Sequence, residues 1–135
     1  MSRPGPPPTP TALRVLKGDR PYRINKHEPR PRKATPQPPA WLTPAALVLW
    51  QAALLELDAM GIMTPADSTA LGLYAQALAE YVDAKAIVAR AGLIVKGRDG
   101  NLVANPACRI ERDRWNMVHR MGAEFGFTPS ARVTI

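Results

Sequence analysis

Apolar residues recur at helical spacing in three stretches of the chain, the first of which follows Thr43-Pro44. Its apolar positions lie three or four residues apart: Leu47, Trp50, Leu54 and Leu57. A single apolar face of this kind is typical of a helix packed against a core. The pattern predicts a helix from Pro44 to about Met60, ended by Gly61.

The second stretch predicts a longer helix from Pro65 to about Ala91, with Asp67 near its positive N-terminal end and Gly92 after it. Its expected buried stripe is Leu71, Tyr74, Leu78, Tyr81, Val82 and Val88. Only a short link separates the two helices, so we expect an antiparallel helical hairpin. This helix carries nine alanines. Either they allow close helix approach in self-association, or they reflect a bias in composition.

The third stretch predicts a helix from Pro106 to about Phe125, ended by Gly126. Its expected stripe is Ile110, Met117, Val118, Met121 and Phe125. Between the second and third helices, two short apolar runs flank Asp99-Gly100, which predicts a short β-hairpin over residues 93–104. Such a ribbon is marginal alone and would need helices or a neighbouring subunit to pack on.

The prolines reinforce these boundaries. All four in residues 40–135 follow Thr or Asn: Thr43-Pro44, Thr64-Pro65, Asn105-Pro106 and Thr128-Pro129. A side-chain oxygen at the N-cap followed by proline is a helix-start signal, because the first N–H groups lack intrahelical acceptors. The last of these pairs begins a tail too short for a substantial helix. The expected fold class is therefore mainly α, with a helical hairpin, a third helix and a short β-hairpin.

Residues 1–39 are different in kind. They hold 11 of the 15 prolines and show no apolar periodicity, which predicts an extended arm attached to a folded part over residues 40–135. A docked strap over Leu13–Asn25 is the alternative for part of this arm.

Charge divides the chain in the same place. The arm holds nine Lys/Arg against two Asp/Glu, a balance of +7, whereas the remainder balances to zero. A basic arm favours a polyanionic partner, with nucleic acid first and an anionic membrane surface second. The expected DNA-binding residues are the eight cations of its central part: Arg14, Lys17, Arg20, Arg23, Lys26, Arg30, Arg32 and Lys33.

A second basic surface could come from Arg112, Arg114 and Arg120, although a role in solubility is the favoured interpretation of these residues. Most carboxylates have a basic neighbour at helical spacing, as in Arg109/Asp113 and Glu111/Arg114, and are expected to form solvated surface pairs. The exceptions are Glu80 and Asp83, which predict an exposed acidic spot.

Nothing in the sequence supports an enzyme. No phosphate-binding loop, zinc-ligand spacing or nucleophile–base pattern is present, and we expect no catalytic residue, metal or cofactor. The single cysteine, Cys108, excludes an intrachain disulfide and fits a reducing cytosol. Neither a signal peptide nor a run of about 18 apolar residues is found, which predicts a soluble intracellular protein with no membrane partner.

In the order and spacing of its short motifs, the chain resembles the small subunits of phage terminases of the HK97-like kind. Lys-Gly-x-Arg-Pro in the arm and Gly-x-Thr-Pro-Ser-x-Arg near the end are the most specific pieces. The matching positions are Lys17, Gly18, Pro21, Trp50, Asp67, Asn105, Pro106, Gly126, Pro129, Ser130 and Arg132. We expect these to be structural or interface residues.

The resemblance implies a non-enzymatic, ring-forming homo-oligomer. Such a protein would recognise the packaging initiation site on viral double-stranded DNA and recruit the terminase large subunit, an ATPase and nuclease. It would act in the host bacterial cytoplasm and be absent from the mature virion. The alternative is a small helical adaptor whose Pro-rich basic arm binds a protein partner or non-specific nucleic acid.

Overall fold

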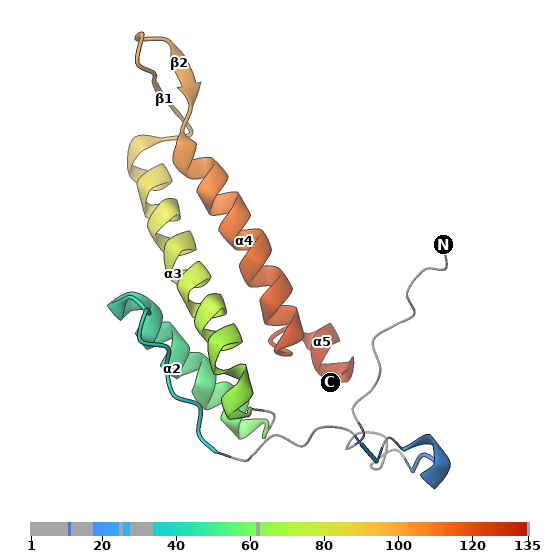
Figure 1. Cartoon of the computed structure of the whole chain (residues 1–135). Helices are drawn as coiled ribbons and strands as arrows, with labels where there is room; N and C mark the ends of the chain where they lie inside the picture. Colours follow the sequence, from blue (N-terminus) through green and yellow to red (C-terminus); the bar gives the residue numbers. More distant parts are fainter. Residues whose placement is uncertain (1–10, 12–17, 25, 28–33, 62, 135) are drawn as a thin grey trace.

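A computed structural model describes residues 11, 18–24, 26–27, 34–61 and 63–134. Its long helices are α2 (Pro44–Ala59), α3 (Ser68–Ala91) and α4 (Pro106–Glu124). The shorter elements are the 3-10 turns η1 (Pro21–Arg23) and η2 (Pro65–Asp67), strands β1 (Ile94–Lys96) and β2 (Leu102–Ala104), and helix α5 (Pro129–Thr134). Figure 1 shows α3 beside both α2 and α4, so the predicted mainly helical fold is confirmed.

The Thr/Asn-Pro pairs begin these helices as predicted. The Thr43 side chain accepts from the amide of Ala46 at 3.3 Å, and the Asn105 side chain accepts from the amide of Ala107 at 3.0 Å. At Thr64 the cap is reciprocal, because the Asp67 carboxylate accepts from the Thr64 amide at 2.9 Å. The predicted second helix differs slightly, since its first turn is the separate 3-10 turn η2.

Glycines end the helices for a conformational reason. Gly61, Gly92 and Gly126 have φ values of +67°, +86° and +75°, in the left-handed region that residues with a Cβ avoid. The predicted C-terminal boundaries of all three long helices are therefore confirmed to within a residue or so.

The core lies between α2 and the first half of α3. Trp50 and Leu57 of α2 are buried against Leu71 and Ala75 of α3. The Trp50 indole N–H donates to the Ser68 carbonyl at 3.5 Å, so its polar atom is also satisfied.

An aromatic cluster closes the same end of the molecule. The ring of Tyr74 lies 6.2 Å from that of Phe125 and 5.3 Å from that of Phe127, and all three pack against the core. Burial raises the pKa of the Tyr74 phenol. The chain after α4 is thereby held against α3, and α5 follows beside the end of α4 (Figure 1).

Before α2, the chain packs on the helices. We call residues 34–42 the docked segment. Within it Pro36 is buried, and the Gln37 carbonyl accepts a hydrogen bond from the Ser68 hydroxyl. Pro39 and Trp41 lie against Gly72 of α3, where an added Cβ would come within 2.8 Å of the Pro39 ring. Pro39 and Trp41 can thus pack closely on α3 because glycine has no side chain.

The predicted β-hairpin is confirmed and projects beyond the ends of α3 and α4 (Figure 1). Val95 pairs with Val103 in antiparallel register, and the amide of Gly100 donates to the Gly97 carbonyl at 3.0 Å to close the turn. Leu102, the first residue of β2, is exposed on the hairpin.

Three of the expected buried positions are wrong. Val82 of α3, and Ile110 and Met117 of α4, are exposed. The face of α4 toward α3 carries the buried Ala107 and Gly122, so small residues occupy the contact and the larger side chains lie at its margin. No helix in the described part of the chain is both long and apolar enough to cross a membrane.

Candidate nucleic-acid interface

The predicted DNA-binding arm is described only in part. Of its eight cations, Arg20 and Lys26 are exposed and Arg23 ends the turn η1. The other five lie outside the described residues: Arg14, Lys17, Arg30, Arg32 and Lys33. The expected strap over Leu13–Asn25 is described only at residues 18–24 and is not tested there. A role for these cations in DNA binding stays a prediction.

The described piece of the arm has a local structure set by proline and glycine. Pro21 starts η1, which closes with the Ile24 amide donating to the Pro21 carbonyl at 3.3 Å. Gly18 just before it has φ of +72°. Arg20 and Tyr22 are both exposed here, which places a cation and an aromatic ring together on the surface.

The second possible basic surface, on α4, is weaker than its composition suggests. Arg112 and Arg120 are exposed, as expected. Arg109 and Arg112 both lie 3.8 Å from the carboxylate of Asp113, which offsets part of their charge. The predicted Arg109/Asp113 pair is therefore confirmed.

Arg114 is not part of that outer surface. It pairs with Glu80 of α3 across the helix contact, with 2.5 Å between Nε and Oε2, instead of with Glu111 on its own helix. The prediction of a solvated Glu111/Arg114 pair is wrong, because Arg114 pairs with Glu80. Glu80 and Arg114 are 34 residues apart, so helical spacing along the sequence could not predict this contact.

The same contact corrects the expected acidic spot. Glu80 is half-buried and also accepts from the Gln76 amide at 3.2 Å. Gln76 in turn accepts from the Thr43 amide at 3.2 Å. Glu80 thus belongs to a set of linked polar side chains that connects the residue before α2 with α3 and α4. Of the two residues of the expected acidic spot, only Asp83 is exposed.

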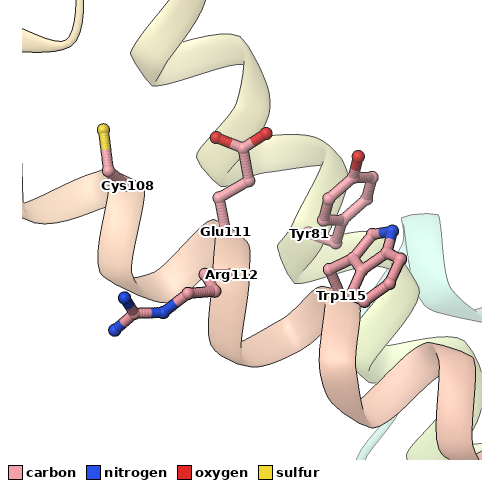
Figure 2. A pocket seen from close by; sticks show the side chains of 5 residues that line it. All are labelled: Tyr81, Cys108, Glu111, Arg112 and Trp115. Carbon is pink, nitrogen blue, oxygen red and sulfur yellow. The ribbon is translucent and has the colours of Figure 1, made fainter.

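A shallow depression lies between α3 and α4, lined by Tyr81, Cys108, Glu111, Arg112 and Trp115 (Figure 2). Its volume of about 240 Å³ is below the usual size of a small-molecule site. In Figure 2 the Arg112 side chain points away from the Glu111 carboxylate, so these charged groups do not converge on one position. The arrangement offers no evident chemistry.

The histidines and the cysteine have ordinary surroundings. His119 stacks on Trp115, with 5.1 Å between ring centroids and planes 3° apart. Cys108 is half-buried as a free thiol, and His27 is exposed. Among the described residues, no three His, Cys, Asp or Glu side chains gather in a way that could hold a metal ion.

The motif positions shared with the terminase family mostly hold helix ends and the core. Trp50 is in the core, Asp67 and Asn105 cap helices, Pro106 and Pro129 begin them, and Gly126 ends one. Ser130 and Arg132 are exposed on α5, Gly18 and Pro21 shape the arm, and Lys17 lies outside the described residues. Their contribution to DNA or partner binding stays a prediction.

Comparison with known families gives one clear match. A family model described as "Phage terminase, small subunit" covers residues 46–135, two thirds of the chain. The match begins after the basic arm, so it rests on the helices and the hairpin alone. No curated protein and no solved structure matches the chain.

Proposed function

The chain belongs to the family of phage terminase small subunits, and from this premise we propose that it is the non-enzymatic DNA-recognition factor of an HK97-like packaging machine. In this role it binds the packaging initiation site on viral double-stranded DNA as a homo-oligomeric ring. It then recruits the terminase large subunit, whose ATPase and nuclease activities cut and translocate the genome. The family match over residues 46–135 is the observation that carries the proposal.

The basic arm supports the DNA contact. Its +7 balance lies within 39 residues, and Arg20 and Lys26 are exposed where the structure describes it. Cations on an extended segment can follow the phosphate backbone and displace condensed counterions, which is the main source of sequence-independent affinity. A short segment of this kind binds weakly alone, but several arms on one assembly raise the effective concentration of each.

Exposed apolar side chains support self-association. Leu55, Leu93 and Leu102 are each more than two thirds exposed in the single chain. A domain of this size often gains stability by covering such surface with another copy. The ring is the form of self-association that membership of the terminase small-subunit family implies.

We assign contact with the large subunit to the C-terminal tail, residues 127–135, whose described part exposes Ser130 and Arg132 on α5. The expected acidic spot at Glu80 and Asp83 offers less for such a contact, since Glu80 is engaged by Arg114. We place the protein in the cytoplasm of the infected bacterium and outside the mature virion.

DNA binding and mass, measured on one preparation, test this function. We expect an assembly larger than a dimer by light scattering, and tighter binding to a fragment carrying the packaging start than to an unrelated fragment of equal length. The large subunit should co-elute with the small subunit and DNA. A protein that binds neither fragment at 50 mM salt, or that remains a strict monomer at micromolar concentration, contradicts the proposal.

A further inference from the structure

The body of the molecule is electrically polar although its total charge is zero. Residues 40–84 contain five Asp/Glu and no Lys, Arg or His, a balance of −5. Residues 85–135 contain nine Lys/Arg and four Asp/Glu, a balance of +5. Helix α2 and the first part of α3 are therefore acidic, while the end of α3, the β-hairpin and α4 are basic.

Helix α2 is apolar on more than the face it buries. Besides the inner residues Trp50 and Leu57, it has an outer row spaced by three and four residues: Ala45, Val48, Ala52, Leu55 and Ala59. All five are exposed, with Val48 65% and Leu55 73% accessible. A helix that is apolar all round is normally covered on both sides. We call this row the α2 outer row.

Helix α3 carries one apolar stripe that is half covered. Leu71, Ala75 and Ala79 are buried in its first half, and Leu71 and Ala75 meet α2. The stripe continues on the helix through Val82, Ala86 and Ala89, and Leu93 follows just past the helix end at Gly92. These four are exposed, with Val82 52% and Leu93 68% accessible. We call them the α3 open row.

Helix length explains why the stripe is open. The 16 residues of α2 span about 24 Å, whereas the 24 residues of α3 span about 36 Å. Helices α2 and α3 are antiparallel, and α2 lies beside the N-terminal half of α3 (Figure 1). It stops short of the C-terminal half of α3. The open row is thus the unfilled part of a helix-packing surface that α2 already uses.

We propose that the α2 outer row of one copy packs on the α3 open row of the next copy, in a head-to-tail assembly. This inference rests on the proposed function, because it names the surfaces through which the ring would form. Each copy would present one row to each neighbour. An interface between two different surfaces of the same chain produces rings when its rotation closes, whereas a self-complementary interface stops at a dimer.

Charge complementarity selects this occupant. The α2 outer row is flanked by Glu56 and Asp58, and the α3 open row by Lys85 and Arg90. All four side chains are exposed, and none takes part in an ion pair among the described residues. Pairing two α2 rows would instead bring acidic flanks together, which opposes a symmetric dimer.

The test reverses each pair of flanking charges in the full-length protein. One variant carries Glu56→Lys and Asp58→Lys, a second carries Lys85→Glu and Arg90→Glu, and a third carries all four. A control variant, Arg109→Glu with Arg112→Glu, makes the same net charge change as the second variant on the outer face of α4. Mass is measured by light scattering at low salt, and circular dichroism checks that each variant folds.

The protein concentration below which the assembly dissociates should be at least about tenfold higher for each half-reversed variant than for the unchanged protein. The reason is that like charges then meet across the interface. The variant with all four changes should recover assembly, since its opposite charges meet again, and the control should assemble normally. Half-reversed variants that assemble normally, or a four-fold variant that fails to recover while folded, overturn the proposed interface.

A crosslink gives an independent measurement. In a Cys108→Ser background, Val48→Cys together with Ala86→Cys should form disulfides between copies and produce a ladder of covalent oligomers under oxidation. Val48→Cys alone should give no ladder beyond a dimer. A ring with no such ladder overturns the interface while leaving the proposed function intact, whereas an unchanged protein that stays monomeric overturns the ring itself.

Discussion

Asn105 is a single buried residue whose side chain and backbone amide connect α3, the β-hairpin and α4. Its oxygen accepts from the amide of Ala107 at the start of α4, and its nitrogen donates to the Gly92 carbonyl at the end of α3, at 2.9 Å. Its own amide donates to the Leu93 carbonyl at 2.8 Å, across the base of the β-hairpin. Both polar atoms of the amide are used, which is what a buried amide requires.

We therefore expect Asn105→Ala to lower the free energy of unfolding by about 1–3 kcal/mol, because it removes both a helix cap and the hydrogen bond to the Gly92 carbonyl. Asn105→Asp keeps the capping oxygen but places a carboxylate against that carbonyl, so it should also destabilise the fold. Urea denaturation measures both changes. If Asn105→Asp had the same free energy of unfolding as the unchanged protein, the hydrogen bond to the Gly92 carbonyl would contribute nothing to stability.

At the scale of elements, the docked segment depends on a glycine in the middle of a helix. Glycine normally costs a helix interior about 0.5–1 kcal/mol relative to alanine. Gly72 and Gly122 both lie inside helices and both are buried. They differ in their neighbours: an added Cβ meets Pro39 at 2.8 Å at Gly72, but nothing closer than Tyr74 at 3.5 Å at Gly122.

This difference gives a matched pair of substitutions. Gly122→Ala should leave stability unchanged or raise it by about 0.5–1 kcal/mol. Gly72→Ala should push Pro39 and Trp41 off α3 and cancel that gain. Hydrogen exchange at the Leu42 amide, which donates to the Pro39 carbonyl at 3.3 Å, reports the release directly. Equal exchange at Leu42 in both variants would contradict the role given to Gly72.

Element boundaries were predictable because they depend on local chemistry. Thr43, Asn105 and the glycines after each helix act within a few residues, so the sequence pattern contains the whole signal. The capping pair of Thr64 and Asp67 is equally local. The β-hairpin turn at Asp99-Gly100 follows the same logic.

Side-chain environments were less predictable because they depend on distant partners. Spacing alone suggested burial for Ile110, but small residues such as Ala107 and Gly122 make the contact of α4 with α3. Val82 is exposed for a different reason, because it lies on the part of α3 that α2 does not cover. Glu80 was expected to be free because its partner, Arg114, lies 34 residues away. For the candidate DNA interface, the role of the basic arm and the division at residue 39 both stay predictions.

At the scale of the whole molecule, the chain combines a basic arm with a body whose two halves carry opposite charge. In our proposal the arm, with its balance of +7, binds phosphates, while the two oppositely charged halves of the body provide surfaces for neighbouring copies. The docked segment links the two functions, because its contacts with Ser68 and Gly72 anchor residues 34–42 on α3.

The salt dependence of DNA binding, compared between the full-length protein and a protein lacking residues 1–33, tests this account most directly. The truncation keeps the docked segment and removes all eight central arm cations. If all eight contact phosphates, the slope of log affinity against log salt concentration reaches about −7 per chain. We predict a steep slope for the full-length protein, and weaker binding with a much flatter slope for the truncated one. Equal affinities and equal slopes would contradict the account and move the DNA contact to the helical body.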